Sequence, residues 1–374
     1  MNKIIQIIKF LLIILIFDFI FTFSLISRLN FYEKFNPSNK HRIANEHYHH
    51  SFQENVETID HWGPYKYKFV TNSLGFKDRS IRKIENVNIS QERIIIIGDS
   101  FTEGIGFIYD DTFVGLLDRK LQNYNIEILN AGVASQSPII YYKKIKYLIE
   151  DQKLKFDKLL IFLDISDIPD DYYYDQEYKN KNFKKIKFRD SLQEFMLKYS
   201  SIYLFIDQIF LKLNNLKEYL SFKYTASKEF NLKLIETNKY HVNLYKSLFV
   251  ERGNWINDNY YWKRHGAQGM EIAKKNLEKL IDICKKYKIE ATLIIYPWPR
   301  QIVNANPNSI HRAVWRNWSK EKKIDFIDLN FYFKSSNPEN LIEKYFIDGD
   351  IHWNKRGHKH IYQIILEEYF KIDF

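Results

Sequence analysis

A serine, a histidine and two aspartates stand at spacings that suit nucleophilic catalysis. Ser100 follows the apolar run RIIIIG at 93–98. A serine on the turn after a buried strand lies exposed at the edge of a sheet, where its own backbone N–H can face an oxyanion. Near the other end of the chain, His352 follows Asp350 and Asp348, so one short loop can bring a base and its carboxylate to Ser100. Taken alone, these residues fit a helix cap and a structural loop at least as well.

Two other apolar runs also end in residues that can stabilise an oxyanion. Gly132 follows the run IEILN, and a glycine there lets a backbone N–H approach a bound oxygen closely. Ser166 and Asp167 follow the run KLLIFLDI at 158–165. Ligands of doubly wound sheets bind beyond the carboxyl ends of the strands, so we expect all these residues at one edge.

The strings around these residues resemble the characteristic blocks of the SGNH, or GDSL-type, serine hydrolases. GDSFTEG is similar to the first block, which implies that Ser100 is the nucleophile and that Asp99 shapes the turn. Gly132 matches the glycine of the second block, whose N–H serves the oxyanion hole. The string DIHWN resembles the D-x-H-W-N form of bacterial membrane-associated members, which implies His352 as the base and Asp350 as its partner, with Asp348 as rival.

The third block departs from the family pattern. The family has G-x-N-D there, and its asparagine donates to the oxyanion. In this chain Asp164 replaces the glycine and Ser166 replaces the asparagine, whereas Asp167 is retained. A serine hydroxyl is shorter than a carboxamide but still donates, so we expect a weakened oxyanion hole made by Ser100, Gly132 and Ser166. Losing one donor outright lowers the rate by about 10²–10³-fold.

The sequence predicts an α/β fold with an N-terminal transmembrane helix and a helical insertion. Short Ile- and Leu-rich runs that alternate with helical patterns are typical of buried parallel strands. They predict a three-layer α/β/α sandwich, flavodoxin-like as in the SGNH family, with a five-stranded parallel sheet. The expected strands are at 93–98, 126–132, 158–165, 291–297 and 325–330. The expected domains are 1–27 (transmembrane signal anchor), 28–90 (connector leading into the body), 91–170 with 260–374 (hydrolase domain) and 171–259 (helical insertion or cap).

The N-terminal segment is long and apolar enough to cross a membrane once. Residues 4–26 consist mainly of Ile, Leu and Phe, and about 20 apolar residues suffice to span a bilayer. Asp18 opposes insertion by about 2.5–3.5 kcal/mol at the bilayer centre, but the surrounding apolar residues outweigh it. Cleavage as a signal peptide would need small residues that only Thr22 and Ser24 approximate, so an uncleaved anchor is expected. Lysines and arginines on the two sides nearly balance and leave the orientation open.

Composition excludes several other classes of protein. The single cysteine, Cys284, excludes an intramolecular disulfide and a thiolate zinc site. The net charge of +10 is spread along the chain, so no nucleic-acid partner is expected. We expect no cofactor, because no phosphate-binding loop or dinucleotide fingerprint is present. We also expect no metal, because His47, His49 and His50 have no carboxylate at ligand spacing and the spacing of Asp170, Asp171 and Asp175 fits no EF-hand loop. The histidines of NEHYHH at 45–50 are read as solvated side chains.

These features predict an esterase or O-acyltransferase that forms an acyl-enzyme on Ser100. The resemblance implies acyl, above all acetyl, esters of a cell-envelope glycan or a small ester as substrate. It also implies a body on the periplasmic or extracytoplasmic side. The sequence does not identify a membrane protein that would supply acyl groups. The altered third block favours an alternative, a membrane-tethered glycan-binding or assembly module with weakened catalysis. Binding of an anionic polymer through net charge is a third hypothesis, and it would weaken steeply with salt.

Overall fold

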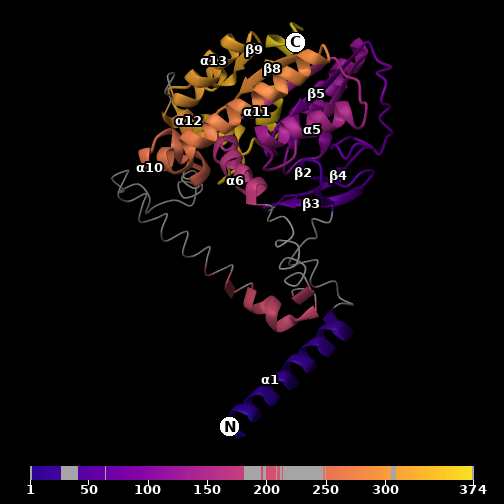
Figure 1. The fold of residues 1–374 in the computed structure, drawn as a ribbon, viewed down its shortest axis with the longest axis vertical. Coiled ribbons are helices and arrows are strands. Elements are labelled where there is room, and N and C mark those ends of the chain that lie inside the picture. Colours follow the sequence, from indigo (N-terminus) through magenta and orange to yellow (C-terminus); the bar gives the residue numbers. More distant parts are fainter. Residues whose placement is uncertain are drawn as a thin grey trace. The chain divides into compact units, whose positions relative to one another are not determined.

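The computed structural model describes two compact units (Figure 1). The described residues are 2–26, 41–63, 65–180, 195–196, 199–207, 209–210, 213, 247–248, 250–304 and 309–372. One unit comprises Met1–Asn39 with Glu177–Lys233, and the other, here called the body, comprises Lys40–Gln176 with Leu234–Phe374. These two units are not the four segments predicted from the sequence. The predicted domain boundaries at 27, 90 and 171 therefore stay predictions.

A five-stranded parallel sheet forms the centre of the body, which confirms the predicted fold class. The strands are β5 (Glu92–Ile97), β6 (Ile126–Asn130), β7 (Lys158–Leu163), β8 (Glu290–Ile295) and β9 (Asp325–Asp328). They run in the order β6-β5-β7-β8-β9, the 2-1-3-4-5 order of flavodoxin-like doubly wound sheets. All four neighbouring pairs are parallel.

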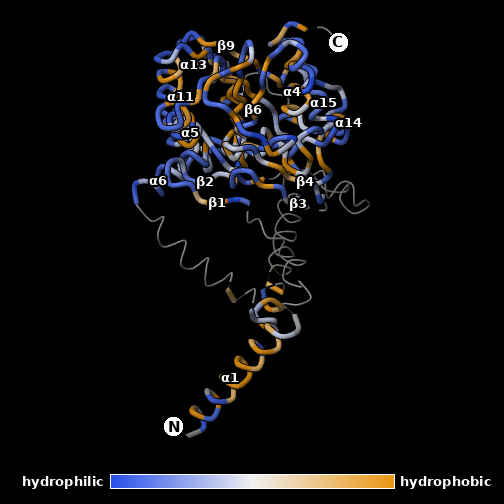
Figure 2. Tube along the Cα trace, turned by 90° about the vertical axis from the view of Figure 1, so that its right-hand side faces the viewer, coloured by the Kyte–Doolittle hydropathy of each residue, from blue (hydrophilic) through white to orange (hydrophobic). Residues whose placement is uncertain are grey.

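Helices cover both faces of this sheet and complete the three layers. They are α4 (Phe113–Leu121), α5 (Pro138–Glu150), α11 (Ala267–Lys286), α13 (Ile310–Lys322), α14 (Pro338–Tyr345) and α15 (Lys355–Glu368). Helix α5 packs against α11, and α4 packs against α15. Figure 2 shows α5, α11 and α13 on one side of the sheet and α4, α14 and α15 on the other.

The apolar runs that predicted the strands are buried because both faces of the sheet are covered. The last five residues of β5 and the last five of β7 are all buried. Continuous burial without alternation is what helices on both faces of a parallel sheet impose. The strand ends are thereby fixed, and the loops at the carboxyl edge are held on a rigid support.

Two antiparallel hairpins precede the sheet, within the segment predicted as a connector leading into the body. Strand β1 (Arg42–Asn45) pairs with β2 (His49–Phe52), and β3 (Glu57–Trp62) pairs with β4 (Tyr65–Val70). The alternating string YKYKFV is β4. Gly75 completes the turn that follows β4, with its N–H donating to Asn72 O and a φ of 67°.

One histidine of the first hairpin is less solvated than the sequence suggested. The His50 side chain is half-buried in β2, and its Nε2 lies 2.9 Å from Ala134 O in the loop after β6. Burial lowers the pKa of His50 to about 4, so its ring is neutral at pH 7. His50 therefore helps to hold the first hairpin against the loop after β6.

Further helices lie in the connections between these elements. They are α3 (Ser100–Glu103), η3 (Tyr109–Asp111), η4 (Gln122–Tyr124), α6 (Asp167–Asn180), η5 (Glu251–Ile256), α10 (Asn259–Tyr261), η6 (Trp262–Gly266), α12 (Pro299–Asn304) and η7 (Leu329–Tyr332). The last residues of α6 belong to the other unit.

The other unit contains the apolar N-terminal helix. Helix α1 (Asn2–Phe21) continues into a π-helical turn, η1 (Thr22–Ile26). The stretch Ile5–Ser24 is long and apolar enough to cross a membrane, with a mean hydropathy of 2.4. Part of the predicted helical insertion at 171–259 lies outside the described residues. Within the described part, α6 covers its beginning and residues 201–207 are helical.

Candidate active site

Ser100 begins the short helix α3 directly beyond the carboxyl end of β5. The Asp99 side chain caps this helix by accepting a hydrogen bond from Phe101 N at 3.0 Å. Gly98 permits the turn, because a Cβ there would lie 2.2 Å from Thr102 Oγ1. The strand, the glycine and the cap together fix the position of the Ser100 side chain at the edge of the sheet.

His352 and Asp350 reach Ser100 from the loop between α14 and α15. His352 Nε2 lies 2.8 Å from Ser100 Oγ, and His352 Nδ1 lies 2.6 Å from Asp350 Oδ1. The backbone N–H of His352 also donates to Asp350 Oδ1, at 3.2 Å. Asp348 is exposed, and Asp350 is the carboxylate in contact with the imidazole. The three side chains therefore form a continuous hydrogen-bonded row, the arrangement that activates a serine.

Asp350 is held as a carboxylate beside the imidazole. Burial raises its pKa, but the hydrogen bond and charge of His352 and the hydrogen bond from Trp62 lower it to about 2. An ionised Asp350 accepts the proton on Nδ1 of His352 and so leaves the lone pair of Nε2 facing Ser100. This tautomer is the one that can take a proton from the serine.

Trp62 contacts both Asp350 and His352, although no pattern in the sequence points to it. Its Nε1 donates to Asp350 Oδ2 at 2.7 Å, and its ring meets the His352 ring edge to face at 5.2 Å. On the other side, Phe101 lies 4.7 Å from His352, between ring centres. Trp62 belongs to β3, in a segment whose sequence shows no period strong enough to reveal its contact with the C-terminal loop.

Ion pairs connect the first hairpin to α3, the helix that begins at Ser100. Arg42 in β1 donates to both oxygens of Glu103, at 2.6 and 3.0 Å, and to Asp60 at 2.8 Å. Glu103 is fully buried in α3 and also accepts from Ala134 N at 2.7 Å. The segment predicted as a connector thus supports the helix that carries Ser100.

Gly132 lies against α3, and its N–H has an internal acceptor. Gly132 N donates to Asn130 Oδ1 at 3.0 Å, and Asn130 Nδ2 donates to Thr102 O at 2.9 Å. A Cβ at Gly132 would lie 2.6 Å from Glu103 N. The glycine is therefore required for close packing of the loop on α3, while the N–H expected to bind an oxyanion donates to a side chain.

Ser166 is buried beyond the end of β7 and bonds to its neighbour Asp164. Ser166 Oγ donates to Asp164 Oδ1 at 2.7 Å, and Ser166 N donates to the same oxygen at 2.7 Å. Trp298, which follows β8, donates its Nε1 to Asp164 Oδ2 at 2.7 Å. Asp164 therefore organises the loop that contains Ser166.

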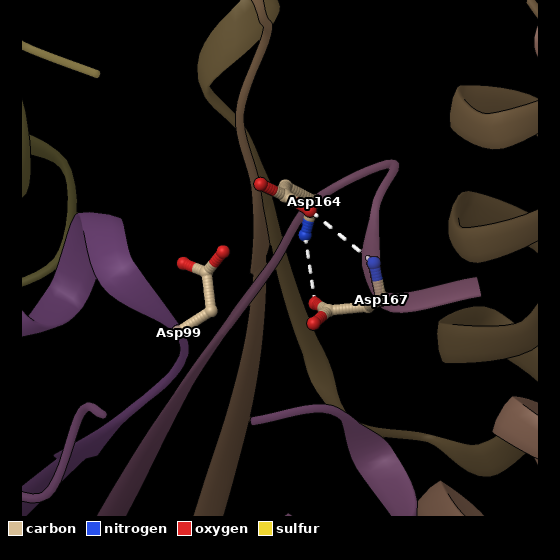
Figure 3. A group of neighbouring side chains, drawn as sticks. All are labelled: Asp99, Asp164 and Asp167. Carbon is tan, nitrogen blue, oxygen red and sulfur yellow. Dashed lines mark hydrogen bonds between the residues drawn. The ribbon is translucent and has the colours of Figure 1, made fainter. Parts of the chain in front are cut away.

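Three buried aspartates lie close together near the carboxyl ends of β5 and β7 (Figure 3). Carboxylate oxygens of Asp99, Asp164 and Asp167 lie within 4.8 Å of one another. Tyr296 Oη donates to Asp99 Oδ1 at 2.9 Å, and Tyr141 Oη donates to Asp167 Oδ1 at 3.1 Å. Burial, and then the charge of Asp164, raise the pKa of Asp99 and of Asp167 well above the usual range of a carboxyl group. The proximity of three carboxyl groups away from water therefore favours the neutral forms of Asp99 and Asp167, because protonation relieves the repulsion within the cluster.

Solved structures resemble this chain at low sequence identity. No protein-family model matches the chain, and no curated protein matches it. Three solved structures to which it is similar are a lipolytic protein of the G-D-S-L family from Desulfitobacterium hafniense DCB-2 (12% identity, TM-score 0.36), a catalytic mutant of the acetylxylan esterase Axe2 from Geobacillus stearothermophilus (12%, 0.38) and the esterase EstA from Pseudoalteromonas sp. (12%, 0.38). These matches cover 73%, 75% and 75% of this chain and 99%, 96% and 98% of the respective structures.

Proposed function

We propose that this protein is an SGNH-type enzyme that acts on ester bonds through an acyl-enzyme on Ser100, as an ester hydrolase or an O-acyltransferase. The observation that carries the proposal is the row of hydrogen bonds from Ser100 Oγ through the His352 ring to Asp350. A serine is a weak nucleophile until an adjacent base can take its proton, and this row supplies that base together with the group that orients it.

The reaction would proceed in two halves. His352 Nε2 takes the proton of Ser100 as Oγ attacks the carbonyl carbon of the ester, and Asp350 stabilises the resulting imidazolium. The tetrahedral intermediate then expels the alcohol, which receives the proton from His352, and an acyl-serine remains. Water or a sugar hydroxyl attacks this acyl-serine with His352 as base, and release of Ser100 restores the enzyme. Water gives hydrolysis, and a sugar hydroxyl gives acyl transfer.

The oxyanion would rest on Ser100 N–H, Gly132 N–H and Ser166 Oγ. The last two donate to Asn130 and Asp164, so each must exchange an internal acceptor for the oxyanion. Such an exchange weakens the net stabilisation, because one hydrogen bond is lost for each that is gained. We therefore expect slow turnover compared with an enzyme whose donors are free.

The substrate we propose is an acyl, above all acetyl, ester of a cell-envelope glycan or of a small alcohol. Support comes from the resemblance of the D-x-H-W-N string to bacterial membrane-associated members of the family and from the apolar helix α1. We propose a single-pass protein whose body lies on the periplasmic or extracytoplasmic side. If the enzyme transfers acyl groups, a membrane protein that supplies them would be its partner.

Pre-steady-state hydrolysis of p-nitrophenyl acetate tests this function. We expect a burst of nitrophenol that matches the enzyme concentration, followed by slow turnover, since the acyl-serine forms before it is cleared. Ser100→Ala and His352→Ala should abolish the burst, whereas Ser336→Ala, at an exposed serine, should leave it unchanged. Addition of a sugar alcohol distinguishes the two activities, because a transferase makes the acetylated sugar. A burst that survives in Ser100→Ala would refute the proposal.

A second candidate function is a membrane-tethered glycan-binding or assembly module without turnover. The observation in its favour is that two of the three expected oxyanion donors already donate within the protein. On this alternative, acetylated oligosaccharides bind equally to the wild type and to Ser100→Ala, and no acyl-enzyme forms with any ester. Isothermal titration calorimetry with both proteins measures this binding.

A further inference from the structure

The unit that contains α1 exposes a row of large apolar side chains. Residues 201–207, 209–210 and 213 are helical and are here called the second apolar helix. Six of its side chains follow the spacing i, i+3, i+4, i+7, i+8 and i+11, which places them on one face of a helix. These residues, here called the apolar stripe, are Ile202, Phe205, Ile206, Ile209, Phe210 and Leu213, and they are 41–67% exposed.

The second apolar helix begins at the side chain of Asp18, within the apolar segment of α1. Asp18 Oδ1 accepts from the backbone N–H groups of Ser201 and Ile202, at 3.1 and 3.2 Å. The hydroxyls of Ser200 and Ser201 also donate to its carboxylate. Asp18 is only 4% exposed and Ser200 only 2%. The one acidic residue of the segment Ile5–Ser24 is thus the acceptor for the start of another helix.

Ser200 is the N-cap of the second apolar helix. Its Oγ accepts from Tyr203 N at 3.0 Å, and its backbone carbonyl accepts from Leu204 N at 3.0 Å. Thr22, one turn after Asp18, accepts from Ser201 N at 2.9 Å. The first N–H groups of the helix, which have no partner within a helix, are therefore satisfied by the cap and by two side chains of the N-terminal segment.

This contact removes two costs that a bilayer would impose. An ionised aspartate opposes insertion into the bilayer, and backbone N–H groups without a partner are strongly unfavourable in hydrocarbon. The N-terminus of a helix carries about half a positive charge, which suits a carboxylate. Asp18 lies six residues before Ser24, the end of the apolar stretch, which is about 9 Å along a helix. In a bilayer crossed by the segment Ile5–Ser24, the second apolar helix would begin at a depth where water cannot hydrogen-bond to these groups.

We propose that the second apolar helix lies in the lipid beside α1, with the apolar stripe in contact with acyl chains and Asp18 holding its N-terminus. The apolar stripe contacts the bilayer, because the second apolar helix begins at the Asp18 side chain. Asp18 lies within the segment Ile5–Ser24, which would cross the membrane. A groove of about 330 Å³ at this start is lined by Ile13, Ile14, Phe17, Asp18, Phe21, Ser201 and Ile202. The membrane attachment then consists of two elements, where the sequence predicted one.

Depth-dependent fluorescence quenching in vesicles tests this proposal. The full chain carrying Phe205→Cys is labelled with the environment-sensitive dye NBD and reconstituted into vesicles of phosphatidylcholine and phosphatidylglycerol that contain doxyl-labelled acyl chains. Cys284 is buried, so the unmodified chain should label only weakly and provides the background. Ile16→Cys in α1 reports insertion of the span, and Ile89→Cys, 82% exposed on the body, reports an aqueous position.

We expect quenching at position 205 within twofold of that at position 16, and none at position 89. Adding Asp18→Ala should lower quenching at 205 severalfold and leave that at 16 unchanged. Asp18→Asn, which retains an acceptor oxygen, should restore part of the quenching at 205. Position 16 quenched with 205 unquenched would overturn the proposal, as would a Phe205→Cys disulfide dimer that excludes the lipid. Quenching at 205 that is insensitive to Asp18→Ala would overturn the assigned role of Asp18.

Discussion

At the scale of single residues, His352 is held from several sides. Asp350 fixes Nδ1, Ser100 faces Nε2, and the rings of Trp62 and Phe101 pack on the imidazole. Trp62 also donates to the second oxygen of Asp350, so the carboxylate is fixed by two partners from distant parts of the chain. Orientation of the His352 ring thus depends on contacts from β3 as well as on its own loop.

Replacing Trp62 tests this dependence. Trp62→Phe keeps an aromatic ring but removes the N–H donor to Asp350, and a hydrogen bond to a charged group contributes about 1.5–3 kcal/mol. We therefore expect kcat/KM for ester hydrolysis to fall about tenfold or more, with kcat affected more than KM. Steady-state kinetics on p-nitrophenyl acetate measure the effect.

The matched control for this substitution is Trp315→Phe. Trp315 is fully buried, and its Nε1 has no hydrogen-bond partner among the described residues. This variant therefore loses indole volume without losing a hydrogen bond, and it should lower stability but leave kcat near the wild-type value. Equal kcat for Trp62→Phe and the wild type would contradict a role for Trp62 in positioning the base.

Residue types and their order could predict from sequence that Ser100, His352 and Asp350 lie together, but not whether the proposed oxyanion donors are free. The proposed nucleophile and base are recognisable from their neighbours in the chain. Whether the N–H of Gly132 or the hydroxyl of Ser166 is free depends on the orientation of the Asn130 and Asp164 side chains, which no local pattern encodes.

At the scale of elements, the site depends on how closely the loop after β6 approaches α3. Gly132→Ala would place a Cβ 2.6 Å from the backbone of Glu103 and displace the helix that carries Ser100. Overpacking of this kind costs about 1–3 kcal/mol, so thermal stability and esterase activity should both fall. Calorimetry and ester hydrolysis measure the two effects.

Gly63→Ala serves as the control for this variant. Gly63 has a φ of 54°, and no atom lies within 4 Å of the position that a Cβ would occupy there, so only backbone strain of about 1–3 kcal/mol applies. We expect this variant to lose stability but keep its activity per folded molecule. Full activity per folded molecule in Gly132→Ala would contradict the coupling between that loop and α3.

Asp171 links α6 to the start of α5 and makes stability depend on pH. Its Oδ1 accepts from Ser137 Oγ and from Ile139 N. Burial raises the pKa of Asp171 to about 7, although hydrogen bonds from Ser137 and Ile139 oppose the rise. Between about pH 4, where an unfolded aspartate ionises, and pH 7, the folded state holds a proton that the unfolded state has lost. The contribution of Asp171 to stability therefore falls as the pH rises through this window.

Asp171→Asn removes this ionisation while retaining an acceptor oxygen. Relative to the wild type, the variant should gain stability between pH 5 and pH 8, by up to about 1.4 kcal/mol for each pH unit below the folded pKa. Chemical denaturation at both pH values measures the difference. Asp151→Asn, at an exposed residue, is the control and should show a much smaller change. A constant difference between Asp171→Asn and the wild type would contradict the raised pKa.

Among the elements, the central sheet could be predicted and the hairpins largely could not. The Ile- and Leu-rich strands are buried on both faces, so each appears in the sequence as a continuous apolar run. Strands β1 and β2 are only four residues long, and β1 is held by ion pairs of Arg42 with Glu103 and Asp60. Such pairings join residues far apart in sequence and produce no local period.

At the scale of the whole molecule, the proposed topology places the N-terminus inside and the body outside the cytoplasm. Alkaline phosphatase, which folds only where disulfides form, should therefore be active when fused after Phe374 in bacterial cells. The same fusion on a chain lacking residues 1–26 should be inactive, because nothing would export it. An inactive full-length fusion beside an active cytoplasmic reporter at the same site would contradict the orientation.

The central claim is that Ser100 is an activated nucleophile, and labelling with a fluorophosphonate tests it most directly. The full chain in detergent is treated with the probe, and the modified peptide is identified by mass spectrometry. We predict one adduct, on Ser100, that is absent in Ser100→Ala, strongly reduced in His352→Ala and unchanged in Ser336→Ala. A folded protein that takes up no probe, or an adduct that persists in Ser100→Ala, would contradict the account.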